Sequence, residues 1–234
     1  MQPPGAQTTR PPDFNSLING LLAADAPLQR RLQIASSLRN VLCAPEHAPF
    51  VQQDSSQLLN ALEQLLYDRS EQMRRQGPVL IGALAAAMRP NLHLFISWLL
   101  YTAQCAAQTM GPLILLVIHE ALEALVLARD TPCVLPYLPD LLGCMQTLLE
   151  GLDEPALTAA LLPLLVTFSR AEFAQALLPH VSEVVDVLLG WSLEASSPPT
   201  VAAKVGSILS KLDGVWRLCP EFPLNVCRQL VSNM

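Results

Sequence analysis

Apolar residues recur along this chain with the spacing of an amphipathic helix. Residues 58–88 read LLNALEQLLYDRSEQMRRQGPVLIGALAAAM, where one apolar face is interrupted by polar residues 67–70 and then begins again. Offsets of three and four residues place such positions on one side of a helix, where they are buried. We therefore predict two helices that share a buried face across a short turn. The apolar positions are Leu58, Leu59, Leu62, Leu65 and Leu66 in the first helix, and Met73, Leu80, Leu84 and Met88 in the second.

The same offsets return further along the chain, in a register that advances by about 41 to 42 residues. Repeats of this length, each a helical hairpin, are typical of HEAT and armadillo arrays. A further step of about 40 residues relates residues 138–149 to residues 178–189. The offsets return at Leu99, Leu100, Ala103, Ala106 and Ala107, and again at Leu141, Leu142, Met145, Leu148 and Leu149.

The predicted fold is all-α, a HEAT- or armadillo-like α-solenoid of about five helical hairpins and a partial one. We expect one elongated domain over residues 12–234, because each repeat of an array contacts mainly its neighbours. Residues 1–11 are proline-rich without an apolar period, which predicts a disordered tail. The repeats are expected at about 12–43, 54–88, 91–128, 133–168 and 172–212, with the partial one at 222–234.

Proline is frequent for a helical chain, with 20 residues. It is tolerated in the first turn of a helix, and many of these prolines fall where we expect helices to begin or end. Pro163 and Pro179 lie inside apolar runs and predict a kink or a helix break. The prolines at expected helix ends are Pro27, Pro78, Pro90, Pro112, Pro132, Pro155 and Pro198.

Composition and charge narrow the classes of function. The chain is 51% apolar but only 5% aromatic, so leucine and alanine form the expected core. Residues 1–90 hold eight arginines against seven acids, whereas the rest holds six basic residues against thirteen acids, giving a net charge of −6. A binder of DNA or RNA would usually show a basic stripe, so we expect no direct contact with nucleic acid.

Membrane insertion and secretion are not expected. Residues 111–128 have about the length of a marginal membrane span, but His119, Glu120 and Glu123 lie at the middle, where charge is costly. The N-terminal residues lack the apolar core of a signal peptide. The six cysteines show no CxxC or other zinc spacing, which favours buried thiols in a reducing compartment. We expect an intracellular protein, located in the cytoplasm, with a nuclear location left open.

The sequence shows no pattern of an enzyme active site. GxSxG, HExxH, a glycine-rich phosphate loop and a kinase catalytic signature are all absent, so we assign no catalytic, cofactor-binding or metal-binding residue and expect no cofactor. His119 and Glu123 share one helix face, and we favour a polar pair over a metal site, which needs more ligands. Packing is the favoured role of Trp98, Trp191 and Trp216.

The turn at residues 67–70 resembles the HEAT motif, in which an Asp in the turn is followed by an Arg on the second helix. The corresponding residues are Asp68 and Arg74. An Asp there can accept N–H bonds from the start of the next helix, and an Arg can reach the Asp of an adjacent repeat. Asp25 and Arg30 loosely parallel this pair, although the spacing differs by a residue. We therefore predict a structural ladder of Asp25, Arg30, Asp68 and Arg74.

A more specific resemblance rests on VVDVLLGWSLE at residues 184–194 and the Pro-Pro turn that follows. This segment resembles part of the N-terminal helical solenoid of the phosphatidylinositol-3-kinase-related kinase of nonsense-mediated mRNA decay. The resemblance implies a non-catalytic scaffold arm whose partners are regulatory subunits of that kinase and its helicase substrate. The chain has no kinase domain, so no catalytic residue is carried over. The residues of the segment are Val184, Val185, Asp186, Leu188, Leu189, Gly190 and Trp191.

Two other classes of function stay open at this point. One is a HEAT-repeat adaptor of another system, such as a transport receptor or a phosphatase scaffold, which the generic repeats allow equally. The other is an α-helical enzyme or a carrier of lipids or small molecules, which requires a closed bundle around a pocket. A repeat that recurs regularly about every 40 residues favours an open array over such a closed bundle.

Overall fold

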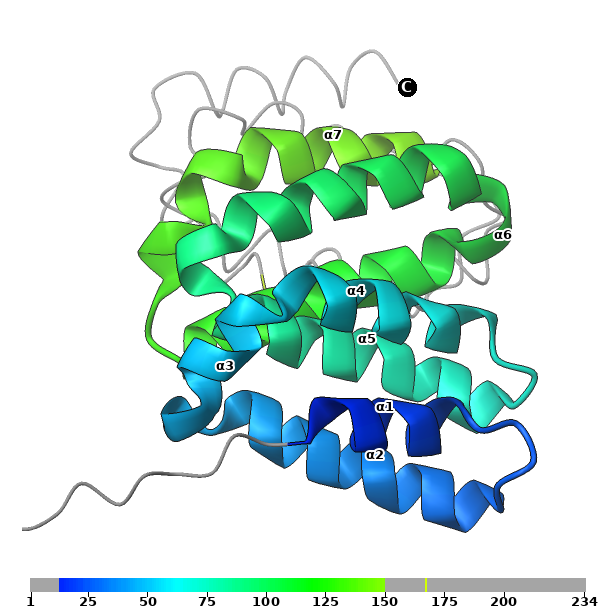
Figure 1. Cartoon of the computed structure of the whole chain (residues 1–234). Coiled ribbons are helices and arrows are strands. Elements are labelled where there is room, and N and C mark those ends of the chain that lie inside the picture. The colour runs from blue at the N-terminus through cyan, green and yellow to red at the C-terminus, as the bar shows by residue number, and fades with distance from the viewer. Residues whose placement is uncertain (1–12, 150–166, 168–234) are drawn as a thin grey trace, which may run out of the picture. The chain divides into compact units, whose positions relative to one another are not determined.

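The computed structural model of the protein describes residues 13–149 and Thr167 (Figure 1). Residues 13–149 are helical and contain no strand, which confirms the all-α class for this part of the chain. The α-helices are α1 (Phe14–Leu22), α2 (Leu28–Cys43), α3 (Ala48–Gln53), α4 (Ser55–Glu63), α5 (Glu71–Ala87), α6 (Leu92–Leu127) and α7 (Leu138–Leu149). Short 3-10 helices lie between them: η1 (Pro45–His47), η2 (Gln64–Tyr67), η3 (Arg89–Asn91), η4 (Thr131–Cys133) and η5 (Leu135–Tyr137).

The described residues fall into two compact units. The first comprises residues 13–99 and 120–128, and the second comprises residues 100–119, 129–149 and Thr167. The predicted tail at 1–11 lies outside the described residues, as do the repeats predicted at 172–212 and 222–234, Pro163 and Pro179. The boundaries of the predicted repeats stay predictions.

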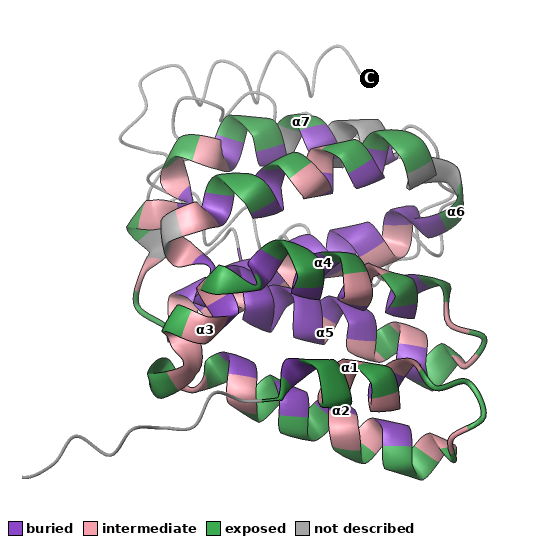
Figure 2. Cartoon of the chain, viewed as in Figure 1, coloured by how far each residue is buried: buried purple, intermediate pink, exposed green. Residues whose placement is uncertain are grey.

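The apolar faces predicted between residues 58 and 88 are buried in the first unit. Every leucine predicted on the first helix is at most 3% exposed, and Met73, Leu80, Leu84 and Met88 are at most 1% exposed. Figure 2 shows the burial concentrated on α5, where only Val79 and Ala86 are half-buried between Gly77 and Ala87. The helical period of the sequence thus identified the core of this unit.

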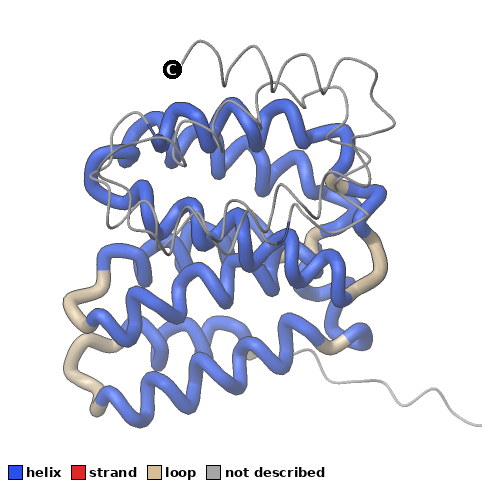
Figure 3. The backbone as a smooth tube through the Cα atoms, turned by 180° about the vertical axis from the view of Figure 1, so that it is seen from behind, coloured by secondary structure: helices blue, strands red, loops and turns tan. Residues whose placement is uncertain are grey.

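Short turns separate the paired helices of the first unit. Residues 23–27 join α1 to α2, and residues 68–70 join η2 to α5. Figures 1 and 3 show these two connections at the same end of the unit, one beside the other. Asp13 caps α1 by accepting the Ser16 N–H at 3.0 Å, and α2 begins directly after Pro27. Asp and Pro are both favoured where a helix begins.

Two prolines expected at helix ends lie inside helices instead. Pro78 is an interior residue of α5 and Pro112 of α6, whereas Pro27, Pro90 and Pro132 lie at or near helix starts. An interior proline removes one hydrogen bond and costs about 3 kcal/mol. In α5 the buried residues on both sides of Pro78 offset that cost. In the second unit Pro112 lies inside α6, where a proline favours a kink.

A glycine permits a close approach of two helices in the first unit. A Cβ atom at Gly82 of α5 would lie 2.6 Å from the carbonyl carbon of Glu120 on α6. Real side chains do not tolerate this distance to a backbone atom, so only glycine fits. The backbones of α5 and α6 touch at this point, which sets the position of residues 120–128 over α5.

Replacement of Gly82 by alanine tests this contact. Overpacking costs about 1–3 kcal/mol, whereas the higher helix propensity of alanine returns about 1 kcal/mol. Gly77→Ala is the matched control on the same helix, because the one tight contact of its Cβ would be with the flexible end of the Leu66 side chain, 2.7 Å from Cδ2. We expect Gly82→Ala to be the less stable variant in urea unfolding. Equal midpoints for the two variants would contradict the close backbone contact.

Candidate functional site

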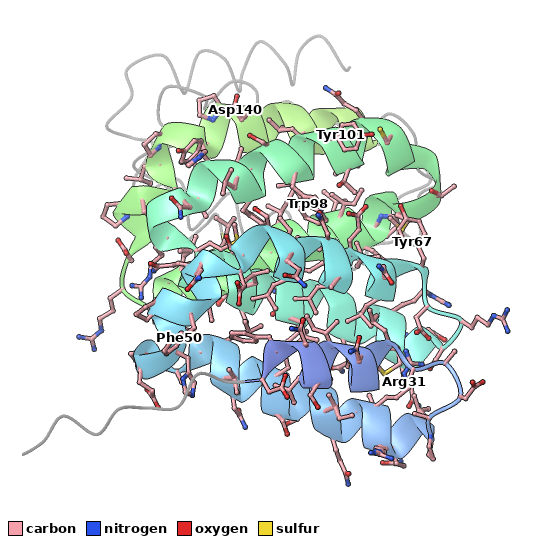
Figure 4. The ribbon with its side chains drawn as sticks, viewed as in Figure 1. Arg31, Phe50, Tyr67, Trp98, Tyr101 and Asp140 are labelled. Atoms are coloured by element: carbon pink, nitrogen blue, oxygen red, sulfur yellow. The ribbon has the colours of Figure 1, made fainter. Side chains whose placement is uncertain are left out.

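A buried arginine joins two helical hairpins of the first unit. Arg31 on α2 is 4% exposed, and its guanidinium donates to both carboxylate oxygens of Asp68, which lies 37 residues further along the chain. The Nη1 to Oδ1 distance is 3.4 Å. Its Nε donates at 2.7 Å to the carbonyl oxygen of Leu21, at the end of α1. The side chain therefore connects the first hairpin to the turn of the second (Figure 4).

Local sequence places both partners of this ion pair. Arg31 precedes Ala35, Leu38 and Leu42 on α2 at helical spacing, so its side chain shares their buried face. Asp68 follows η2 in an extended conformation, and its Oδ1 accepts the Ser70 N–H at 2.8 Å. A carboxylate there satisfies an N–H that precedes α5.

A second arginine donates hydrogen bonds to the same turn. Arg74 lies in α5, and its Nη1 donates to the carbonyl oxygens of Asp68 at 2.7 Å and Arg69 at 3.2 Å. Charged donors form stronger hydrogen bonds than neutral ones, so this contact holds the turn against the first part of α5. The turn at 68–70 is thus fixed from α2 on one side and from α5 on the other.

The surroundings of Asp68 favour its ionised form. The hydrogen bond from Arg31 lowers the pKa of the carboxyl below its usual value, and burial opposes this change. The Ser70 N–H and the charges of Arg31 and Arg74 lower the pKa further. The pair is therefore a charged one, in which the buried guanidinium is matched by an ionised partner.

The structure brings two of the four predicted ladder residues together with one residue that was not assigned to the ladder. Asp68 and Arg74 share the turn, whereas Asp25 and Arg30 are exposed. Arg31 reaches the adjacent hairpin. Two signals indicate Arg31: it lies in the apolar period of α2, and it follows Asp25 by six residues, as Arg74 follows Asp68. The ladder as a whole stays a prediction, and residues 184–191 lie outside the described part.

A groove lies where three helices of the first unit end. Its volume is about 320 Å³, and its lining combines apolar side chains from α2, α5 and α6 with four charged residues. Arg39 is contributed by α2 and Glu120 by α6. The lining residues are Arg39, Leu42, Cys43, Ala44, Pro45, Ala48, Val79, Ala83, Ala86, Ala87, Arg89, Glu120, Glu123, Ala124, Leu127 and Ala128.

His119 and Trp98 have structural partners. In the second unit His119 Nδ1 lies 2.9 Å from Thr167 Oγ1, and Thr167 is fully buried. Trp98, in the first unit, is half-buried, and its Nε1 donates to Glu63 at 2.9 Å. Among the described residues, no group of three or more His, Cys, Asp or Glu is arranged to hold a metal ion.

The cysteines differ in their surroundings. Cys144 is buried, and burial raises the pKa of its thiol to about 12, so it is not a nucleophile near neutral pH. Cys43 and Cys105 are exposed, which corrects the prediction of buried thiols for these two residues. Cys219 and Cys227 lie outside the described residues.

One segment passes a membrane-span test by length and composition. Thr109–Leu127 is long and apolar enough to cross a bilayer, but half of this window is buried within the fold. A core helix has the same properties, so the finding is weak support for a span.

Comparison with known proteins finds a distant similarity to a kinase. The chain is 20% identical over 215 residues to serine/threonine-protein kinase SMG1 of Danio rerio. The matched region is 88% of this chain but only 6% of that kinase. No family model matches the chain, and no solved structure matches it.

The similarity thus concerns a small segment of a large kinase. The described residues of this segment are helical, as a helical region outside a kinase domain would be. At 20% identity and this coverage, the activity and partners of the kinase are not transferred to the chain by the comparison itself.

Removal of the Arg31 side chain tests its structural role. Breaking one partner out of a buried ion pair leaves an uncompensated charge and costs about 3–5 kcal/mol. We expect Arg31→Met to lower the free energy of unfolding by about 3 kcal/mol in urea unfolding followed by circular dichroism. Arg30→Met is the matched control, since Arg30 is exposed, and should change stability by less than about 0.5 kcal/mol. Equal stability of the two variants would contradict a stabilising role for the ion pair between Arg31 and Asp68.

The lowered pKa of Asp68 predicts an acid-sensitive contribution to stability. The unfolded carboxyl binds a proton near pH 3.9, whereas the folded one binds it at lower pH. The stabilisation is therefore complete above about pH 4 and is lost as the pH falls through the folded pKa. We expect the stability difference between the wild type and Asp68→Asn to be largest near neutral pH and to shrink below about pH 4. A difference that is constant from pH 7 to pH 3 would contradict the ion pair.

Proposed function

We propose that this chain is a non-catalytic scaffold, a segment of the helical arm of a protein kinase similar to SMG1. In this proposal the helical hairpins continue as a HEAT-like α-solenoid that binds other proteins. The observation that carries the proposal is the ion pair between Arg31 and Asp68, which links successive hairpins. The similarity to a segment of SMG1 supports the assignment to a kinase of this kind.

The repetition of this turn supports an array. Asp25 and Arg31 in the first hairpin correspond to Asp68 and Arg74 in the second, and both positions advance by 43 residues. Arg31 uses the position to contact the next hairpin, whereas Arg74 contacts its own turn. A contact of one repeat with its neighbour is the kind of interaction that stabilises a solenoid.

The proposed partners follow from the resemblance to the decay kinase. They are its regulatory subunits and the helicase that it phosphorylates, and we place the protein in the cytoplasm or nucleus with them. Solenoids bind through extended surfaces of successive hairpins, with affinity from a few anchoring side chains. The proposal therefore requires no catalytic centre and no cofactor in this chain.

Binding to purified partners tests the proposal. We expect the immobilised full chain to bind at least one regulatory subunit or the helicase in biolayer interferometry. The chain alone should hydrolyse ATP no faster than a buffer blank. An unrelated HEAT-repeat protein of similar length serves as the control surface. Failure of all these partners to bind would reject the assignment to the decay kinase, and binding of a transport cargo or a phosphatase subunit instead would indicate an adaptor of another system.

A further inference from the structure

One end of the first unit holds most of its arginines. Figures 1 and 3 show the turns at 23–27 and 68–70 side by side at this end. We call residues 23–31 and 67–75 the arginine end. They contain five arginines and three acidic residues, whereas the other described residues of the first unit contain two arginines and six acidic residues. The arginine end is therefore the positively charged part of an acidic unit.

Packing of the two hairpins brings exposed arginines from separate parts of the sequence together. The ion pair between Arg31 and Asp68 joins α2 to the second turn. Arg30 precedes Arg31 in the chain, Arg69 follows Asp68, and both are exposed. Arg30 and Arg69 thus flank the ion pair, one from each hairpin. An extended peptide advances about 3.3 Å per residue, so a few residues suffice to contact both side chains.

Two of the five arginines are matched by carboxylates within the arginine end. Arg31 is paired with Asp68 in a contact where their side chains are 5% and 15% exposed. Arg75 Nη2 lies 2.6 Å from Oε1 of Glu71, one turn earlier on α5, and both side chains are largely exposed. These four charges cancel in pairs, so they do not give the arginine end its sign.

Three arginines remain without a carboxylate of their own. Arg74 donates to the backbone carbonyl oxygens of Asp68 and Arg69, which carry no net charge. Within the described part of the chain, Arg30 and Arg69 form no ion pair. Asp25, which is exposed in the first turn, is the remaining acidic residue of the arginine end. Three positive charges are thus opposed by one negative charge.

Helix dipoles do not alter this sign. Each turn joins the carboxyl end of one helix to the amino end of the next. The helix α1 ends at Leu22 and α2 begins at Leu28. In the same way η2 ends at Tyr67 and α5 begins at Glu71. The two kinds of helix end carry opposite partial charges of about half a unit each, which largely offset one another. The arginine side chains therefore determine which partner is attracted.

A short acidic segment of a protein fits this surface better than a nucleic acid does. Three unmatched arginines would neutralise about three phosphates, which gives only weak and salt-sensitive binding. A longer strand would continue over the acidic remainder of the unit and be repelled there. Tyr67 is 60% exposed in the same segment. Tyrosine and arginine are enriched among the residues that contribute most to protein–protein binding.

We propose that the arginine end docks an acidic segment of a partner protein. Carboxylates of that segment pair with Arg30 and Arg69, and its other atoms pack beside Tyr67. Arg74 stays bound to the turn and adds to the positive potential. The inference rests on the proposed scaffold function and names the chemistry of one class of partner.

Fluorescent peptides of defined charge test the arginine end in the full chain. The probe is a short Gly/Ser peptide with four consecutive glutamates at its centre, and the matched probe has glutamines in their place. We expect fluorescence anisotropy at low salt to show binding of the glutamate probe and at least about tenfold weaker binding of the glutamine probe, a difference equal to about 1.4 kcal/mol. Binding of the glutamate probe should weaken as salt is added, because the contacts are exposed.

Variants of the chain locate the binding site. Arg30→Gln and Arg69→Gln should each weaken the glutamate probe about two- to fivefold, as expected for one exposed ion pair. The double variant should weaken it about tenfold, while its thermal midpoint stays near that of the wild type because both residues are exposed. Arg39→Gln is the matched charge control, since Arg39 is exposed on α2 outside the arginine end, and it should bind like the wild type.

Three results would overturn the proposal. They are no binding of the glutamate probe, an equal loss from Arg39→Gln and from the arginine-end variants, or at least about tenfold tighter binding of a labelled oligothymidylate with four phosphates. The last result would indicate a nucleic-acid partner instead.

Failure of this docking surface is distinct from failure of the scaffold proposal. If the kinase subunits bind the chain but the glutamate probe does not, the scaffold stands and the docking surface is rejected. If the glutamate probe binds as expected but no subunit does, the docking surface stands and the assignment to the decay kinase is rejected.

Discussion

Burial of the Arg31 guanidinium constrains the positions of the neighbouring elements of the first unit, because they must supply its partners. A buried charge is tolerated only when it is paired and hydrogen-bonded. Arg31 meets this requirement through Asp68 and the carbonyl of Leu21, which belong to the second turn and to α1. Asp68 in turn accepts from Ser70, and its carbonyl accepts from Arg74. A shift of either hairpin along the other would break both hydrogen bonds between Arg31 and Asp68, so this ion pair restricts their register.

With that register set, α5 becomes the central helix of the unit. Its buried positions occupy most of the length from Gly77 to Ala87, and Gly82 admits the backbone of α6. The turn end and the groove end of α5 differ. At the turn end Arg31, Asp68 and Arg74 are paired within the chain, whereas at the groove end Arg39 is exposed and Glu120 is half-buried. A cluster of charged hydrogen bonds therefore lies at one end of α5, and a groove lies at the other.

Several of the described polar groups have roles in local structure. His119 contacts Thr167, Cys144 is held in its thiol form by burial, and the arginines of the turn serve the backbone and Asp68. A protein that presents surfaces needs rigid hairpins and exposed grooves, and it does not require perturbed groups gathered in one cleft. The similarity to a small part of SMG1 is one of the observations from which the scaffold role is proposed.

The sequence by itself determined the paired helices between residues 58 and 88, their buried apolar face and the position of Asp68 in the turn between them, because these depend on spacing within one hairpin. The sequence also indicated a buried position for Arg31, which lies at helical spacing from Ala35 and Leu38. The predicted ladder nevertheless contains Arg30, the residue beside it. Tertiary structure decided which arginine reaches Asp68, since that depends on how two hairpins pack. It decided the course of α5 through Pro78 as well, because packing on both sides outweighs a local penalty. The groove exists only where the ends of α2, α5 and α6 meet, and no single stretch of sequence encodes that approach.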